Sequence, residues 1–315
     1  MNRGEILMMR EIMIPLATGL AFFMFGMKIM RIGLDKLSGE HLQQFIYQFT
    51  KTPYHGFFTG TIATLLLQSS SAVTVLTIGL INAGMMDFFQ TIGIILGTNL
   101  GTVATVELLA LEISRISVPL LLIGAIFFLF PYPKIRAIGL FLGGFAIIFL
   151  GMDALQMISE PIKHTGWLQT LLSYPEHQDL IGLLIGIMMT SIVQSSSATI
   201  AMTMGMFYGS AIPLNFGLAI VLGANIGTCI TAILASIGGN KEGKQVATAH
   251  LLLNVLGVAI FYPLIPEFVF VVTHLTTYPP AQIAHFQLIF NLLSSLVVLP
   301  FAKPFARLTL FLAPK

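Results

Sequence analysis

The sequence reads TLLLQSSSAVTVL at residues 64–76 and TSIVQSSSATIAM at residues 190–202. Both stretches lie at the centre of longer apolar segments, 54–84 and 178–208. One amide and three hydroxyl groups at such a depth are costly in a lipid bilayer unless they line a cavity. Each segment is therefore predicted to form two half-helices that meet at the serines. A half of about 13 residues is roughly 20 Å long, too short to cross a bilayer alone.

The composition of the whole chain supports a membrane location. Of its 315 residues, 56% are hydrophobic and only 9% are charged, and the mean hydropathy is +0.91. Soluble domains carry about 25% charged residues, so this composition argues against a soluble enzyme, a nucleic-acid-binding protein and a disordered chain. The single cysteine excludes an internal disulfide framework. The sequence predicts an all-α polytopic membrane protein.

Seven apolar runs have the length expected of membrane spans. They lie at about 12–33, 89–111, 115–131, 136–155, 214–235, 246–264 and 284–301. Three further stretches do not fit a full crossing. Residues 34–53 and 156–177 are mixed in polarity and suit helices at the membrane surface, and residues 267–278 are apolar but short.

The chain matches itself when shifted by 126 residues. Gln68–Ala72 falls on Gln194–Ala198, and LGTNLGT at 96–102 falls on LGANIGT at 222–228. With a shift of 125, AFFMFGM at 21–27 falls on AIIFLGM. Broken helices at corresponding positions of two repeats are typical of secondary transporters. Duplication of a scaffold without a transport role is the alternative.

These matches predict a single transmembrane transporter domain over residues 1–315. The first repeat spans about 12–131, the second about 136–264, and a terminal helix spans about 284–301. If each QSSS segment is re-entrant, one repeat contains an odd number of crossings, so the two repeats have inverted topology. If each segment crosses fully, the repeats run parallel. We favour inverted repeats, each with a re-entrant or broken helix that carries QSSS.

The two QSSS clusters are the leading candidates for an anion site. Serine hydroxyls donate and accept hydrogen bonds, and a half-helix that begins just after them presents free N–H groups and a positive dipole end. Both features favour an anion. The alternative is that the hydroxyls only bond to their own or neighbouring helices. The predicted substrate-binding residues are Gln68, Ser69, Ser70, Ser71, Gln194, Ser195, Ser196 and Ser197.

The motifs GTNLGT and GANIGT are the candidates for a cation site. Their paired glycines favour local unwinding, which would free carbonyl oxygens beside the Asn amides and Thr hydroxyls. Hard oxygen ligands of this kind suit a small alkali cation. Close helix packing through small residues is the alternative. The residues concerned are Asn99, Thr102, Asn225 and Thr228.

Neither candidate region contains a basic residue. No Lys or Arg occurs from Thr52 to Ser114 or from His164 to Asn240. We therefore expect helix ends, hydroxyls and a co-bound cation to balance a bound anion. Moving a dianion inward against about 100 mV costs roughly 4.6 kcal/mol, which two co-transported sodium ions cancel. This favours cation-coupled symport.

Motifs of catalysis and of resident cofactors are absent from the sequence. It contains no G-x-S-x-G, no H-E-x-x-H and no P-loop, and no histidine lies in either QSSS motif to act as a base for the serines. We expect the protein not to be an enzyme and to hold no cofactor, with sodium acting only as a co-transported ligand.

At these motifs the chain resembles the type II sodium–phosphate cotransporter family. That family carries a duplicated QSSS motif, each copy followed by a motif like G-x-N-I-G-T, and here the pairs are 68–71 with 97–102 and 194–197 with 223–228. The similarity covers roughly residues 20–301. It implies sodium-coupled transport of inorganic phosphate by alternating access. It also implies that QSSS serines bind sodium, which adds Ser71 and Ser197 to the sodium ligands.

Two other functions stay open at this point. One is phosphate export, or transport of another small anion, on the same scaffold. The other is a membrane sensor or scaffold that transports nothing. The expected partners are inorganic phosphate, sodium, the lipid bilayer and a second copy of the chain, and no nucleic acid. The expected location is a bacterial inner membrane.

Overall fold

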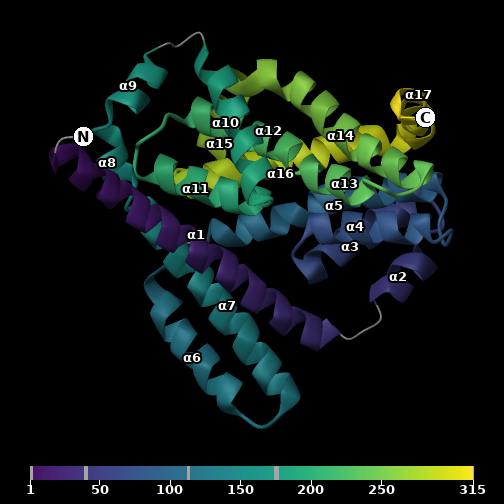
Figure 1. The fold of residues 1–315 in the computed structure, drawn as a ribbon, viewed down its shortest axis with the longest axis horizontal. Coiled ribbons are helices and arrows are strands. Elements are labelled where there is room, and N and C mark those ends of the chain that lie inside the picture. The colour runs from purple at the N-terminus through teal and green to yellow at the C-terminus, as the bar shows by residue number, and fades with distance from the viewer. Residues whose placement is uncertain (1–2, 39–41, 112–113, 174–176, 315) are drawn as a thin grey trace.

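The computed structural model describes residues 3–38, 42–111, 114–173 and 177–314. In these ranges the chain is helical, with short turns and no strand (Figure 1). The helices are α1 (Arg3–Ser38), α2 (Leu42–Phe49), α3 (Pro53–Leu67), α4 (Ser70–Asn82), α5 (Phe88–Leu109), α6 (Ser117–Leu129), α7 (Pro133–Gln156), α8 (Ser159–Lys163), α9 (Gly166–Leu172), α10 (Gln178–Val193), α11 (Ser196–Tyr208), α12 (Leu214–Gly227), α13 (Cys229–Ser236), α14 (Lys241–Phe261), α15 (Ile265–Leu275), α16 (Pro279–Val298) and α17 (Ala302–Leu312).

Six described helical stretches are long and apolar enough to cross a membrane. They are Arg10–Leu37, Phe88–Leu109, Pro133–Lys163, Leu214–Ser236, Lys241–Leu275 and Pro279–Leu312. The expected span at 115–131 is the exception, because α6 has only 13 helical residues. The short apolar stretch at 267–278 is α15 and continues the span of α14. The protein is therefore an integral membrane protein of the predicted helical class.

Both QSSS segments are broken where the sequence predicts. Gln68 ends α3 in the left-handed region (φ 49°, ψ 36°), and Gln194 ends α10 in the same way (φ 56°, ψ 29°). The next residue in each case, Ser69 or Ser195, is extended and caps the following half-helix. A left-handed residue followed by an extended one cannot continue a helix, so the chain changes direction at the serines.

The second half of each broken segment runs back toward the side from which the first half entered. Glycines of α5 fix this arrangement, because Gly93 packs on the Pro53 carbonyl at the start of α3 and Gly97 packs on the Phe57 carbonyl one turn later. Helices α3 and α5 therefore run parallel. Since α4 connects the end of α3 to the start of α5, α4 must be antiparallel to both.

The second repeat is built in the same way. Gly223 of α12 packs on the Leu183 carbonyl of α10, and Gly227 packs against Thr190 near the end of α10. Helices α10 and α12 therefore run parallel, and α11, which connects the end of α10 to the start of α12, is antiparallel to both. Close backbone approach at a helix crossing needs residues without a Cβ, which is the role of these glycines.

Helices α1 and α7 pack closely against each other over several turns and run antiparallel. Gly19 lies against Gly151, Gly26 against Gly144, and Gly33 against Ala137. Residues 21–27 of α1 match residues of α7 in the internal alignment, so two sequence-related helices run in opposite directions. Helix α6 packs on α7 through Gly124, and this pair projects from the body of the molecule (Figure 1).

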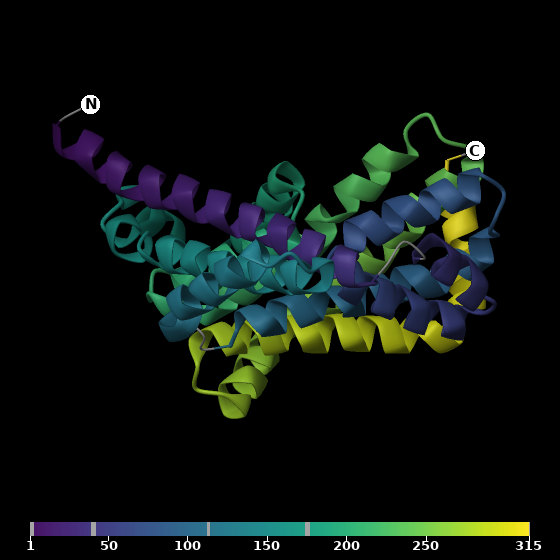
Figure 2. The same ribbon diagram turned by 90° about the horizontal axis from the view of Figure 1, so that it is seen from below.

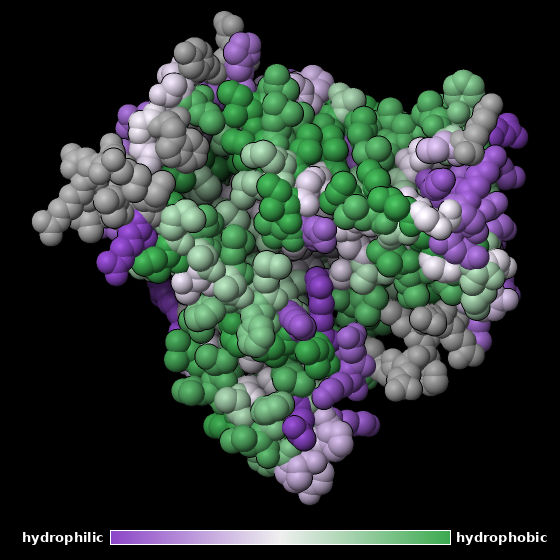
Figure 3. All heavy atoms as spheres, viewed as in Figure 1, coloured by the Kyte–Doolittle hydropathy of each residue, from purple (hydrophilic) through white to green (hydrophobic). Residues whose placement is uncertain are grey.

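The remaining helices form the body that surrounds the two broken segments. Figure 2 shows α1 (purple) along one face of the molecule and α16 (yellow-green) along the opposite face. Large apolar side chains are exposed over much of the surface, as at Leu129 (81% exposed) and Ile192 (75%). Figure 3 shows that hydrophobic side chains cover most of the visible face, while hydrophilic ones gather at the right margin and in a line from the centre toward the lower tip. Such a surface suits contact with lipid.

The helix-packing glycines lead to a stability prediction. Replacing Gly97 or Gly223 by Ala places a Cβ against a backbone carbonyl of the neighbouring parallel helix. We expect each substitution to lower the free energy of unfolding by about 1–3 kcal/mol, because packed backbones cannot move apart cheaply. The measurement is thermal unfolding in detergent, followed by circular dichroism.

Gly79 of α4 is the matched control. It is also helical, but no atom beyond its own helix backbone lies within 4 Å of the position of its Cβ. Gly79→Ala should leave stability unchanged or raise it by about 0.5–1 kcal/mol. An equal loss at Gly79 and Gly97 would contradict the assigned packing role.

Candidate functional site

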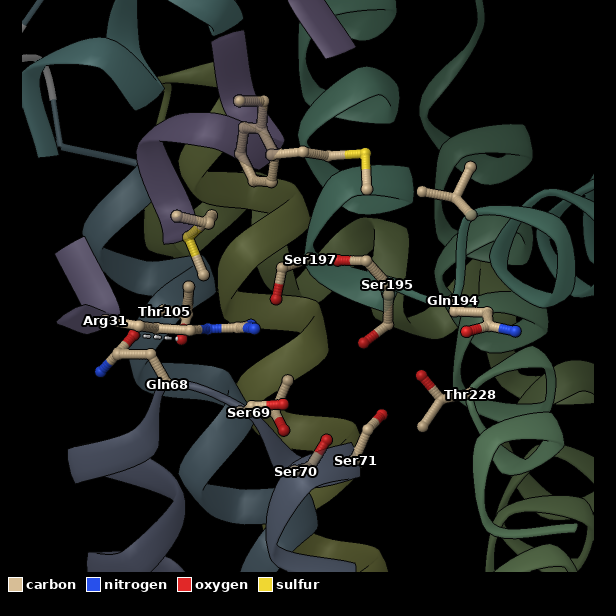
Figure 4. Close-up of a pocket in the computed structure, with 16 residues that line it drawn as sticks. Arg31, Gln68, Ser69, Ser70, Ser71, Thr105, Gln194, Ser195, Ser197 and Thr228 are labelled. Carbon is tan, nitrogen blue, oxygen red and sulfur yellow. Dashed lines mark hydrogen bonds between the residues drawn. The ribbon is translucent and has the colours of Figure 1, made fainter. Parts of the chain in front are cut away.

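The two QSSS motifs line one cavity. It has a volume of about 280 Å³ and lies where the breaks of the two repeats face each other (Figure 4). All eight predicted substrate-binding residues line it, from Gln68 to Ser71 and from Gln194 to Ser197. The remaining lining residues are Phe23, Met24, Met27, Arg31, Thr102, Thr105, Val193 and Thr228. Motifs 126 positions apart in the chain thus meet in space.

Helices α4 and α11 both begin at the wall of this cavity. Ser69 accepts a hydrogen bond from the Ala72 N–H at 3.2 Å, and Ser195 accepts one from the Ala198 N–H at 3.3 Å. The N–H groups of the first two residues of each half-helix have no acceptor within their helix. Two positive helix ends with free N–H donors therefore border the same space, an arrangement that suits an anion.

Several serine hydroxyls remain available to a ligand. Ser70, Ser196 and Ser197 are at most 8% exposed and line the cavity. In the described part of the chain, these three hydroxyls have no hydrogen-bond partner. Ser71 differs, because its oxygen accepts a hydrogen bond from the Thr231 hydroxyl at 3.1 Å. That bond joins the first repeat to the second at the edge of the cavity.

The two glutamines have different surroundings. The Gln68 amide donates to the Leu65 carbonyl at 2.7 Å, and its oxygen accepts from the Thr105 hydroxyl at 2.6 Å. Its side chain is therefore held by its own repeat. Gln194 is exposed, and its side chain makes no comparable bond among the described residues. The cavity is thus pseudo-symmetric in sequence but not in hydrogen bonding.

The cation motifs are only partly at the cavity. Thr102 and Thr228 line it, but Asn99 and Asn225 do not. The Asn99 amide donates to the Asn254 oxygen at 3.2 Å. Asn225 and Gln287 exchange two hydrogen bonds, at 2.8 and 3.2 Å. Asn99 therefore joins α5 to α14, and Asn225 joins α12 to α16. Their role as sodium ligands stays a prediction.

The expectation of local unwinding is wrong for the first repeat. Helix α5 runs without interruption through Gly97, Asn99 and Thr102. In the second repeat only Thr228 interrupts the helical assignment between α12 and α13, and its backbone stays close to helical geometry (φ −58°, ψ −27°). The glycines serve close packing on α3 and α10 instead, which was the alternative considered for them.

Arg31 corrects the expectation that the site has no fixed positive charge. It lies on α1 and lines the cavity, and Figure 4 shows its side chain extended toward the space between Ser69 and Ser197. Sequence reasoning missed it because the search for charge was confined to the regions around the two motifs. A signal was present, since an arginine inside an apolar span marks a functional position by default.

Comparison with known protein families gives a match over nearly the whole chain. The family model described as "Na+/Pi-cotransporter" matches twice, at residues 22–157 and 154–290. Each match contains one QSSS segment and the glycine-rich motif that follows it. The two matches meet at residues 154–157, later in the chain than the division predicted between the repeats at about 131–136.

Three curated relatives illustrate the range of similar proteins. The chain is 35% identical over 303 residues to the uncharacterized protein YqeW of Bacillus subtilis (strain 168), covering 96% of this chain and 99% of the relative. It is 27% identical to the candidate inorganic phosphate export protein YjbB of Escherichia coli (strain K12), covering 94% of this chain but only 54% of that protein. Over 90 residues it is 36% identical to the human sodium-dependent phosphate transport protein 2B, covering 27% of this chain and 13% of that protein. No solved structure gives a significant match.

The Asn225–Gln287 pair can be tested directly. Asn225→Ala and Gln287→Ala should each lower stability, and the double variant should lose less than the sum of the two. We expect a coupling free energy of about 0.5–2 kcal/mol, as measured for contacting polar pairs between membrane helices. Thermal unfolding of the four proteins in detergent, without added sodium, gives this value. Strict additivity would mean that the pair does not hold α12 to α16.

Proposed function

We propose that this chain, which belongs to the Na+/Pi-cotransporter family, carries inorganic phosphate across a bacterial inner membrane together with sodium. One observation carries the proposal. Two half-helix N-termini from the two repeats, each with a QSSS motif, border one cavity within the helical body. A transporter needs a ligand site inside the membrane that both halves of the protein share.

The chemistry of the cavity fits phosphate. A tetrahedral oxyanion offers four acceptor oxygens, and the cavity presents N–H groups from two helix ends, serine hydroxyls and one guanidinium. Among the described residues that line it, none is acidic. Phosphate would therefore meet donors without repulsion from a carboxylate. We assign it to Gln68, Ser69, Ser70, Ser71, Gln194, Ser195, Ser196 and Ser197.

Sodium coupling rests on the oxygen ligands and on the charge balance. Hydroxyl oxygens at the cavity come from Ser71, Thr102, Ser197 and Thr228. Asn99 and Asn225 lie one helical turn before the two threonines in the sequence. One arginine balances only half the charge of a phosphate dianion. One co-bound monovalent cation would make the loaded cavity neutral. The cost of moving uncompensated charge against the membrane potential, about 2.3 kcal/mol per charge at 100 mV, favours such coupling.

Alternating access requires two halves that can exchange roles. Two observations support inverted repeats. Helices α1 and α7 pair antiparallel, and α4 and α11 each run antiparallel to the half-helix that precedes them. In inverted repeats, the first repeat can form an entrance on one side of the membrane, and the second repeat can form an equivalent entrance on the opposite side. Rocking of one repeat against the other would open the cavity alternately.

Phosphate export is the second candidate function. It is favoured by the similarity to the E. coli relative named for export, although this chain spans about half the length of that protein. The same cavity serves either direction, because the gradients of sodium, phosphate and potential decide the net flux.

The transport proposal predicts sodium-dependent uptake of labelled phosphate into proteoliposomes. Ser70→Ala and Ser196→Ala should each weaken phosphate affinity about 5- to 100-fold, since each removes a donor from a buried site. Both variants should fold, because a small residue replaces a small one.

Ser191→Ala is the matched control for these variants. Ser191 lies on α10 within one turn of Gln194 and does not line the cavity, so its loss should leave uptake unchanged. Uptake that does not depend on the sodium gradient would contradict sodium coupling. Efflux of phosphate loaded inside the vesicles would favour export. Absence of any phosphate flux would favour a sensor or scaffold.

Inverted topology can be tested with single cysteines. In a Cys229→Ser background, Met85→Cys and Ser210→Cys place thiols at exposed turns after α4 and α11. The native Cys229 is fully buried. If the repeats are inverted, an impermeant thiol reagent should label the two positions from opposite sides of the membrane. Labelling of both from the same side would contradict inverted repeats.

A further inference from the structure

Arg31 is the one basic side chain among the described residues that line the cavity. It comes from α1, outside both broken segments. Its equivalent in the second repeat, at a shift of 125, is Gln156. The positive charge therefore has no symmetry mate. This asymmetry is independent of the QSSS motifs, which are identical in the two repeats.

The guanidinium has no partner that explains its position. The Nε atom of Arg31 is buried and makes no hydrogen bond in the described part of the chain. Asp35, one turn further along α1, is exposed and acts on Arg31 only at longer range, because the two form no ion pair among the described residues. A buried donor on a charged group without an acceptor is costly, so a ligand is the natural acceptor.

The surroundings of Arg31 indicate an anion. Figure 4 shows its guanidinium pointing into the cavity, with Ser197 on one side and Ser69 on the other. It thus faces the beginnings of α4 and α11, whose positive ends repel a guanidinium rather than stabilise it. Three positive features that converge on one space are stable only when negative charge lies between them. A planar guanidinium also binds tetrahedral oxyanions through paired N–H donors.

Figure 4 also shows the far side of the same cavity. Ser71 and Thr228 lie away from Arg31, and Thr231 holds the Ser71 oxygen from across the repeat boundary. Hydroxyl oxygens gather there without a positive side chain among them. A cation is repelled least at that end.

We infer that Arg31 is the fixed cationic ligand of the transported anion and that it divides the cavity into two ends. Phosphate occupies the end between Arg31, Ser69 and Ser197, and sodium occupies the end at Ser71 and Thr228. Of the two serines proposed above for both ions, Ser197 then serves phosphate and Ser71 serves sodium. This inference rests on the proposed function and adds which end of the cavity takes which ion. Anion binding also connects α1 to the N-termini of α4 and α11, because one ligand contacts all three.

The test compares the binding of two ions by the same purified protein in detergent. Equilibrium binding of ³²P-labelled inorganic phosphate is measured at fixed sodium, and binding of ²²Na is measured without phosphate. Arg31→Gln should weaken phosphate binding about 10- to 100-fold, the loss expected for a charge-assisted hydrogen bond. The same variant should bind sodium as well as or better than the unaltered protein, because a repelling charge is gone. A defect of folding would weaken both ions.

Lys28→Gln is the matched control. Lys28 lies on α1 one turn before Arg31, is exposed and does not line the cavity, so the same change of net charge should leave both affinities unaltered. Unchanged phosphate affinity in Arg31→Gln would overturn the inference, and so would equal weakening of both ions. If the unaltered protein bound no phosphate, the proposed function itself would fail, which is a different result.

Arg31→Lys keeps the test decisive if Arg31→Gln does not give a monodisperse protein. It retains the charge and loses the paired donors. We expect a severalfold loss of phosphate affinity with unchanged sodium binding. If Arg31→Gln is not available, full phosphate affinity in Arg31→Lys would overturn the role of the guanidinium.

Discussion

The left-handed turn at Gln68 and Gln194 is the constraint on which the cavity depends. A non-glycine residue in this region costs roughly 1–2 kcal/mol, so the surrounding structure must hold it. The Gln68 side chain contributes by bonding to Leu65 and Thr105. The turn ends one helix and begins another at the wall of the cavity. The polar groups released there would be unstable in lipid and are stable only around a shared, hydrated or ligand-filled space.

Glycine contacts convert these turns into one site. The turn alone sets only the direction of α4 and α11. Their positions follow from α3 and α10, which are held by Gly97 and Gly223 of the parallel helices α5 and α12. Close backbone contact leaves little freedom for the hairpins to slide. In the sequence these glycines suggested unwound cation sites. In the structure they pack α5 and α12 against α3 and α10 instead, and this packing determines where the serines lie.

The cavity combines repeated and unrepeated features, and this has a functional consequence. Two equivalent helix ends create a site that both repeats line, as the proposed alternating access requires. In a fully symmetric site, however, nothing would favour binding of an anion at one end and of a cation at the other. Arg31 and the bond between Thr231 and Ser71 both break that symmetry. Binding of unlike ions side by side becomes favourable once the positive side chain stands at one end only.

The sequence by itself determined the membrane class, the repeat and the position of each break. These are local or compositional properties, since charge content, helix length and the QSSS motif can be read without knowing which segments meet. It also supplied all eight QSSS residues of the cavity. Tertiary structure alone decided that α5 stays helical through Asn99 and that Arg31 enters the site. Each of these depends on packing between distant segments: Gly97 meets α3, Asn99 meets Asn254, and α1 crosses the broken helices far from its place in the chain. No pattern confined to one segment contains that information, because the partner that fixes the outcome lies elsewhere in the sequence.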